Sequence, residues 1–410
     1  MKSKFAVFLL NVALSPTFAQ TPPAPGAAGR GGFAPPVKSP EVSPQGKVTF
    51  RLRAPNAKEV GVTGIGQRLA MEKDDQGVWS ATTDVLKPDI YSYSFSVDGA
   101  TFTDPGNPQV KTAYGSAGQS IVHVPGAVSW EPAAGVVRGA VTRHFYHSTV
   151  VGDDRDFWVY TPGNYDPKRN PAYPVLYLLH GLGDESSSWL GVGAANTILD
   201  NLIAQGKAKP MIMVTPLGYG TAGGGRGAPD MIEFFAKALL EEVMPQVEKV
   251  YNVSKDRNQR AIAGLSMGGA EATYTGLNHL DRFAWIGSFS GAYVMWPGAN
   301  GAPGRGAGPP PPAPPGAPGG RGARPVLDDS VIARNFANLD SKANAQIRLL
   351  WIACGTADGL IGVNRQFKDW LKSKDVKFTD VEVPEVAHVW PLWRQNLTEL
   401  APLLFQGKGR

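Results

Sequence analysis

Short runs of consecutive apolar residues constrain the fold of the second half of this chain. They lie at residues 174–181, 210–218, 261–266, 283–291 and 348–355. Strands that are buried on both faces of a parallel sheet have this composition, because neither face meets water. Helical patterns occupy residues 195–207, 231–251 and 364–374, between and after the runs. We therefore predict an α/β domain in which a doubly wound sheet carries helices on both faces.

The segment 47–126 has a different pattern, with a period of two. Apolar residues alternate with polar ones at 48–53 and again at 91–97, and Asp98-Gly99 follows the second of these stretches. Alternation is typical of strands with one buried face, and Asp-Gly favours a tight hairpin turn. The pattern predicts a small antiparallel β-sandwich ahead of the α/β domain, which we assign to residues 127–410.

Proline and glycine are concentrated in two segments. Residues 20–46 and 298–325 are rich in both and hold almost no large apolar side chains. Such segments cannot bury enough apolar surface to offset the entropy of ordering. We predict a linker at 20–46 and a disordered surface insert at 298–325, with a functional lid as the alternative for the insert.

The first 19 residues have the three parts of a secretory signal. Lys2 and Lys4 precede an apolar run over residues 5–14, and Thr17-Phe18-Ala19 ends in a small residue. The apolar run is far shorter than the about 20 residues that a membrane-spanning helix needs. We predict cleavage after Ala19 and a secreted or periplasmic protein that has no membrane partner.

Composition excludes several other classes of function. The formal net charge is +5, but the lysines and arginines form no cluster, so we expect no nucleic-acid partner. The single cysteine, Cys354, excludes an intrachain disulfide and a multi-cysteine metal site, and its apolar surroundings indicate a buried thiol. No residue pattern indicates a metal ion or another cofactor. The oligomeric state is not determined by the sequence.

Ser266 lies where one predicted strand turns into a helix. The stretch 261–274 reads AIAGLSMGGAEATY, so the serine stands between glycines, after an apolar run and before an alanine-rich segment. The G-x-S-x-G pentapeptide alone is a weak signal in a glycine-rich chain, but a strand before it and a helix after it are the context of a nucleophile elbow. We predict that Ser266 is a nucleophile.

A nucleophilic serine needs a base and a carboxylate that orients the base. In folds with such an elbow the chain order is serine, acid, histidine, and only His279 and His388 follow Ser266. His279 is interpreted as a residue at a helix end, whereas His388 lies in a loop after a further strand that we predict at residues 378–384. Asp358 directly follows the strand at 348–355, at the carboxyl edge where sites of open α/β sheets form. We predict Asp358 as the acid and His388 as the base.

The oxyanion hole is expected to consist of backbone N–H groups. Met267 follows the nucleophile, and Leu182 lies in the loop after the strand at 174–181. These two residues are therefore predicted to donate the hydrogen bonds. His180, which precedes that loop, is interpreted as a residue that steadies it.

These motifs resemble a known family. HGLGDESSSW, GLSMGGAEA, CGTADG and AHVWPLWRQNL are similar to the esterase D group, carbohydrate esterase family 1, which includes feruloyl and acetylxylan esterases. The resemblance runs from about residue 146 to 405 and implies an α/β-hydrolase fold with Ser266, Asp358 and His388 as nucleophile, acid and base. The sandwich resembles early-set modules related to carbohydrate-binding module family 48.

The resemblance implies a secreted serine esterase that acts on feruloylated or acetylated plant polysaccharide or oligosaccharide, with feruloyl favoured over acetyl. A flat aromatic acyl group needs aromatic walls, and Trp189, Trp390 and Tyr293 are the expected substrate-binding residues. Trp393 is expected in the core. The alternatives are an enterochelin-type siderophore esterase and a non-catalytic carbohydrate-binding protein on a hydrolase scaffold. Whether the sandwich binds carbohydrate or only supports the esterase domain stays open.

Overall fold

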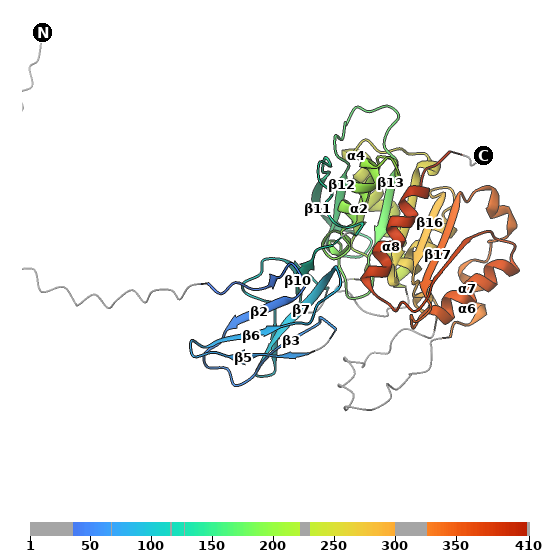
Figure 1. Ribbon diagram of the computed structural model, residues 1–410. Helices are drawn as coiled ribbons and strands as arrows, with labels where there is room; N and C mark the ends of the chain where they lie inside the picture. The colour runs from blue at the N-terminus through green and yellow to red at the C-terminus, as the bar shows by residue number, and fades with distance from the viewer. Residues whose placement is uncertain are drawn as a thin grey trace, which may run out of the picture. The chain divides into compact units, whose positions relative to one another are not determined.

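The computed structural model describes residues 36–66, 68–114, 117–126, 128–221, 230–299 and 326–407 (Figure 1). The predicted signal peptide, most of the predicted linker and residues 300–325 of the predicted insert lie outside the described residues. From Lys38 on, the chain belongs to one compact unit. No helix among the described residues is long and apolar enough to cross a membrane.

An eight-stranded sheet forms the centre of the second part of the chain, as far as it is described. Its strands in spatial order are β11 (Ala140–Ser148), β12 (Asp153–Thr161), β14 (Ile212–Pro216), β13 (Val175–Leu179), β15 (Arg260–Leu265), β16 (Trp285–Phe289), β17 (Leu349–Gly355) and β18 (Thr379–Val383). The hairpin β11–β12 is antiparallel, and β12 also runs antiparallel to β14. From β14 to β18 every neighbouring pair is parallel. The predicted α/β-hydrolase fold is confirmed.

Helices cover both faces of this sheet. In chain order they are α1 (Ser188–Gly191), α2 (Ala195–Ala204), α3 (Met231–Ala238), a π-helical turn η2 (Leu239–Val243), α4 (Met244–Val250), α5 (Met267–Asn278), α6 (Asp329–Asn335), α7 (Ile361–Ser373) and α8 (Trp390–Leu400). Short 3₁₀ turns are η3 (Arg257–Gln259), η4 (Tyr293–Met295), η5 (Ser341–Ala345) and η6 (Ala401–Leu403). The helices predicted at 195–207, 231–251 and 364–374 are all present, the second of them as α3, η2 and α4 in succession.

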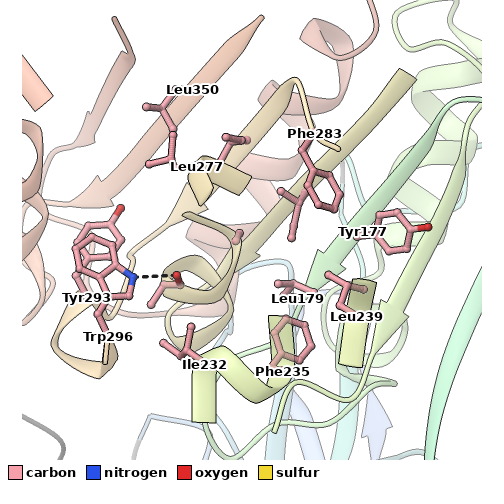
Figure 2. Close-up of a cluster of buried hydrophobic side chains, with 14 of the residues drawn as sticks. Tyr177, Leu179, Ile232, Phe235, Leu239, Leu277, Phe283, Tyr293, Trp296 and Leu350 are labelled. Carbon is pink, nitrogen blue, oxygen red and sulfur yellow. Dashed lines mark hydrogen bonds between the residues drawn. The ribbon is translucent and has the colours of Figure 1, made fainter. Parts of the chain in front are cut away.

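The apolar runs are continuous because the side chains of a strand pack into two hydrophobic cores, one on each face of the sheet. Along β13, Tyr177 and Leu179 belong to a core that is closed by α3, η2, α4, α5, α6 and α7. The side chain between them, Leu178, belongs to the opposite core, which α2 and α8 close. Figure 2 shows Phe235 and Leu239 beside Tyr177 and Leu179, on the face of β13 that these two residues share. Both faces of the strand are buried, so apolar and polar residues do not alternate along it.

The first part of the described chain is a sandwich of two antiparallel sheets. One sheet orders β1 (Glu41–Val42), β2 (Val48–Arg53), β6 (Val78–Thr82) and β5 (Glu72–Lys73). The other orders β4 (Leu69–Ala70), β3 (Val60–Thr63), β7 (Asp89–Val97), β10 (Gln119–Val124) and β9 (Val110–Lys111), with β8 (Ala100–Phe102) paired to β7. Val48, Phe50 and Leu52 are buried between the sheets, as their alternation predicted.

The sandwich begins earlier than its sequence pattern indicated. β1 lies inside the predicted linker and pairs with β2, and the Ser39 hydroxyl donates to the Asp104 carboxylate at 2.6 Å. The boundary at residue 46 was therefore wrong, because a two-residue edge strand is too short to show a period.

Arg394 connects the helix α8 to the sandwich. Its fully buried guanidinium donates to the Val192 carbonyl at 2.6 Å and to the Asp89 carboxylate of β7, and it lies 4.6 Å from the centre of the Trp130 ring. Burial raises the pKa of Asp89, while the charge of Arg394 opposes the rise. Both charges are thus partly or fully removed from water, and each is stabilised by the opposite charge of the other.

We predict that Arg394→Met destabilises the protein by about 3 kcal/mol, because it leaves the largely buried Asp89 carboxylate without its arginine partner. Chemical denaturation followed by tryptophan fluorescence measures the loss. Arg53→Met, at an exposed arginine of β2, is the matched control and should change the free energy of unfolding by less than about 0.5 kcal/mol. Equal effects of the two substitutions would show that the Arg394–Asp89 pair contributes nothing.

Candidate active site

Ser266 forms the tight turn between β15 and α5. Its backbone has φ 53° and ψ −116°, in a region that residues with a side chain rarely adopt. The turn is fixed by hydrogen bonds from Ser266 N to the Phe289 carbonyl (2.8 Å) and from Ala292 N to the Ser266 carbonyl (2.9 Å). Between residues 260 and 270, Ser266 alone is not buried. The strained turn therefore exposes the predicted nucleophile at the carboxyl edge of the sheet.

Close packing at Gly268 allows this turn. A Cβ atom at Gly268 would lie 2.5 Å from the His180 carbonyl oxygen and 2.6 Å from that of Leu179. No side chain fits there, so the first turn of α5 lies directly against the end of β13. Gly268, the first glycine after the predicted nucleophile, thus allows the helix to pack closely on the sheet.

Asp358 and His388 form a hydrogen-bonded pair. Asp358 follows β17 and is 2% exposed; its Oδ2 accepts from His388 Nδ1 at 2.7 Å, and its Oδ1 accepts from Leu360 N at 2.8 Å. Burial by itself would raise the pKa of Asp358, but the hydrogen bond and charge of His388, with smaller effects of Leu360 N–H and the Ser290 hydroxyl, lower it overall. The carboxylate is therefore ionised at neutral pH.

The pair leaves Nε2 of His388 as the nitrogen that can take up a proton. The ring packs edge-on against Trp393, with 4.8 Å between ring centres, and 35% of the side chain is exposed. Among the described residues, Ser266 Oγ forms no hydrogen bond with His388. Ser266, Asp358 and His388 follow β15, β17 and β18, so all three lie at one edge of the sheet. Catalytic hydrogen bonds are often loose in enzymes without substrate and tighten when the substrate is bound.

Two backbone N–H groups at the predicted oxyanion hole belong to elements that approach each other closely. Met267 is the first residue of α5, where N–H groups have no partner within the helix. Leu182 follows Gly181, at which a Cβ atom would lie only 3.3 Å from Ser266 Cβ. Leu182 and Met267 also pack in one small apolar cluster. The structure thus brings both predicted donors next to the predicted nucleophile.

His180 holds the loop that carries Leu182. Its buried ring donates from Nδ1 to the Gly181 carbonyl at 2.8 Å and accepts at Nε2 from Gly218 N at 2.9 Å. Burial lowers the pKa of His180, so the ring is neutral and both nitrogens are engaged. The interpretation of His180 as a residue that steadies the loop agrees with this geometry.

Two of the three predicted substrate-binding residues are wrong. Trp189 and Tyr293 are both fully buried. The Trp189 indole donates to the Leu179 carbonyl, and the Tyr293 hydroxyl donates to Ser288 while its ring stacks on Trp296. Both rings fill the core beneath the site, because each one finds an internal partner for its polar atom, and neither has surface to offer a ligand.

Trp390 is the predicted wall residue that keeps exposed surface. It is half-buried, and its ring meets Trp189 and Trp393 edge-on, with 5.2 Å between ring centres in each case. Trp393 is buried, as expected, and lies between Trp390 and His388. Trp390 is thus one aromatic ring away from the predicted base.

The structure also shows features that the sequence analysis missed. A cavity of about 560 Å³ is lined by residues from the sandwich, the β11–β12 hairpin and the loops after β13 and β14: Tyr114, Arg143, Phe145, Tyr146, His147, Asp154, Arg155, Asp156, Glu185 and Leu217. Tyr114 and Leu217 pack with Leu182 and Met267 in one cluster, which connects this cavity to the predicted oxyanion hole. Its residues come from separate stretches, and no sequence motif joins them.

Glu271 is a second missed feature, directly behind the elbow on α5. It is fully buried, and neither carboxylate oxygen has a hydrogen-bond partner among the described residues. Burial raises the pKa of Glu271 well above its ordinary value and so favours the neutral acid. No group of three or more potential metal ligands lies together in the part of the chain that the structure describes.

Comparisons with known proteins identify the family and the fold. The family model named Esterase matches residues 148–404. The endo-1,4-beta-xylanase/feruloyl esterase of Xylanibacter ruminicola is 29% identical over 383 residues, which are 90% of this chain and 46% of that protein. This chain therefore spans less than half the length of that relative.

Two solved structures share the fold. A ferulic acid esterase of Anaeromyces mucronatus in complex with ferulic acid is 24% identical, with a TM-score of 0.54, and the match covers 68% of this chain and 94% of that one. The enterobactin esterase of Shigella flexneri is 19% identical, with a TM-score of 0.60, and the match covers 87% of this chain and 92% of that one. Since the family model covers well over half of the residues, this protein belongs to the Esterase family.

Proposed function

We propose that this protein is an exported serine carboxylesterase that hydrolyses feruloyl esters on plant cell-wall polysaccharide through an acyl-enzyme. The observation that carries the proposal is the Asp358–His388 pair at the same sheet edge as Ser266, whose strained turn exposes its hydroxyl. A serine hydroxyl needs such a base to act as a nucleophile, whereas a serine that only forms a tight turn needs no base beside it. The export rests on the signal-like sequence of residues 1–19.

Each predicted residue has one role in this reaction. Ser266 Oγ attacks the acyl carbon, and its proton moves to Nε2 of His388, whose charged ring Asp358 stabilises. The N–H groups of Leu182 and Met267 bind the oxyanion that forms. His388 then gives the proton to the departing sugar hydroxyl. Water, activated by the same histidine, attacks the acyl-enzyme and releases the free acid and Ser266.

The feruloyl group is the favoured acyl group because of the name of the Xylanibacter relative, an endo-1,4-beta-xylanase/feruloyl esterase. The half-buried ring of Trp390 near His388 is consistent with an aromatic acyl group. Acetyl is the first alternative, since the burial of Trp189 and Tyr293 removes two of the aromatic walls that distinguished the two substrates.

A catechol ester of the siderophore type is the second alternative. It is favoured by the enterobactin esterase structure, whose match extends over 87% of this chain and so beyond the esterase domain. The signal-like first residues argue against it, since an exported enzyme would not meet a siderophore complex that is already inside the cell. Parallel assays of one purified sample on methyl ferulate, acetylated xylan and a tris-catechol lactone separate the three substrates.

The assignment of the nucleophile and base is tested by substitution. Ser266→Ala and His388→Ala should each lower kcat on methyl ferulate by several orders of magnitude at unchanged circular dichroism, because the first removes the nucleophile and the second removes the base that activates it. Asp358→Asn is expected to retain more activity. His279→Ala, at the other histidine that follows Ser266, is the control and should stay within a few-fold of the parent. Near-normal turnover by Ser266→Ala would contradict the mechanism.

Trp390 is tested as the wall of the acyl pocket. Trp390→Ala should lower kcat/KM for methyl ferulate by about ten- to hundredfold, since burying an aromatic acyl group against a tryptophan contributes roughly 1–3 kcal/mol. The loss for a short acetate ester should be within about threefold, because acetate does not reach the ring. Trp390→Phe keeps an aromatic wall and should recover most of the ferulate activity. Equal losses on both esters would favour acetyl as the natural acyl group.

A further inference from the structure

A short segment of the sandwich packs against the loop that carries Leu182. The segment consists of residues 110–114, and we call residues 181–187 the oxyanion loop. Lys111 Nζ lies 2.6 Å from Oδ1 of Asp184, and only 17% and 9% of the two side chains are exposed. The neighbouring Thr112 hydroxyl contacts the Glu185 carboxylate and lies 3.2 Å from Ser187 Oγ. Sandwich and oxyanion loop are therefore linked by a largely buried ion pair and adjacent hydrogen bonds.

Tyr114 reaches the same loop through Tyr219. The two rings stack with 4.5 Å between their centres and 24° between their planes. The Tyr219 hydroxyl accepts from Gly183 N at 2.6 Å and donates to the Asp184 carbonyl at 3.1 Å. Tyr114 thus fixes the ring whose hydroxyl holds the backbone directly after Leu182.

Leu182 lies between two held residues. On one side the Gly181 carbonyl accepts from His180 Nδ1 and from Asp184 N. On the other side Gly183 N donates to Tyr219. The direction of the Leu182 N–H therefore depends on Asp184 and Tyr219, and each of these contacts the sandwich.

Asp184 makes this dependence strong. Its side chain is almost fully buried, and among the described residues Lys111 is its one ion-pair partner. Without Lys111 the carboxylate would be a desolvated charge with no counter-charge, which is unfavourable enough to move the loop toward water. A displacement of the order of 1 Å is sufficient to impair a catalytic donor.

We infer that Lys111 and Tyr114 are positioning residues for the oxyanion hole, so that the sandwich is a structural part of the active site. This inference rests on the proposed function, because it needs an oxyanion at Leu182. Neither side chain touches the reacting atoms. Lys111 sets the oxyanion loop through Asp184, and Tyr114 sets it through Tyr219.

The test uses p-nitrophenyl butyrate and the full-length protein, so that no polysaccharide contact enters the measurement. Lys111→Met keeps the aliphatic stem and removes the charge. It should lower kcat by about ten- to hundredfold, since loss of one oxyanion donor costs about 10²–10³ and misplacement costs less, while KM stays within about threefold. Lys111→Arg should recover most of kcat. Lys58→Met, at an exposed lysine of the sandwich, is the matched control and should equal the parent.

Further variants distinguish a displaced oxyanion loop from an unfolded protein. Lys111→Met/Asp184→Asn removes both charges and should have a higher kcat than Lys111→Met, because no unpaired charge remains. Tyr114→Ala should lower kcat, whereas Tyr114→Phe keeps the stacked ring and should not. Inactivation by diethyl p-nitrophenyl phosphate, whose phosphoryl oxygen needs the same donors, should slow in parallel with kcat. Circular dichroism of each variant identifies any that has lost its fold.

The outcomes separate this inference from the proposed function. An unchanged kcat of Lys111→Met on the small ester overturns the inference. If the same variant nevertheless loses activity on feruloylated polymer, Lys111 is a carbohydrate contact and the inference is still overturned. A rise in KM at constant kcat overturns it as well. Failure of the proposed function has a different signature, since then the parent protein would not hydrolyse the small ester or Ser266→Ala would still do so.

Discussion

The close approach of backbone to backbone at the end of β15 is the constraint on which the rest of the site depends. Ser266 holds a positive φ that costs on the order of 1–3 kcal/mol, and the turn persists because Phe289 and Ala292, at the end of β16 and just after it, hydrogen-bond its N–H and its carbonyl. The packing of Gly268 on the carbonyl oxygens of β13 sets the distance between helix and sheet. The same contact brings the first N–H groups of α5 beside the loop after β13, so the predicted nucleophile and the predicted oxyanion donors lie close together.

Two buried acids near this turn illustrate how surroundings assign different chemistry to the same functional group. Asp358 receives hydrogen bonds from His388 and Leu360, which hold its pKa below the ordinary value despite burial. Glu271 receives none from the described residues, and burial raises its pKa. The surroundings of Asp358 favour an anion that can stabilise a charged histidine, whereas burial favours the neutral form of Glu271. Hydrogen-bond donors make this difference, since both side chains are buried.

The aromatic residues in the core of the sandwich are not the residues that contact the esterase domain. Trp79 and Tyr93 are buried between its sheets, with Trp79 bonded to the Ala54 carbonyl, so they stabilise the module and are not free to stack on sugar. The contacts with the esterase domain come from strand β9 and the residues after it, and from Asp89 at the start of β7. The sandwich thus contributes charged and aromatic contacts to the neighbouring domain.

The sequence by itself determined the order of strands and helices, the elbow at Ser266, the pairing of Asp358 with His388 and the burial of Trp393 and Cys354. These follow from periodicity, from small residues at a tight turn and from the chain order of an α/β-hydrolase, all of which are local or ordered along the chain. Only the tertiary structure decided that Trp189 and Tyr293 lie in the core, that β1 belongs to the sandwich, and that Lys111 meets Asp184. Such contacts join residues far apart in the chain, and a ring at a strand end has the same sequence signature whether it faces a ligand or the core. Burial and long-range ion pairs depend on how whole elements pack, and no local pattern contains that information.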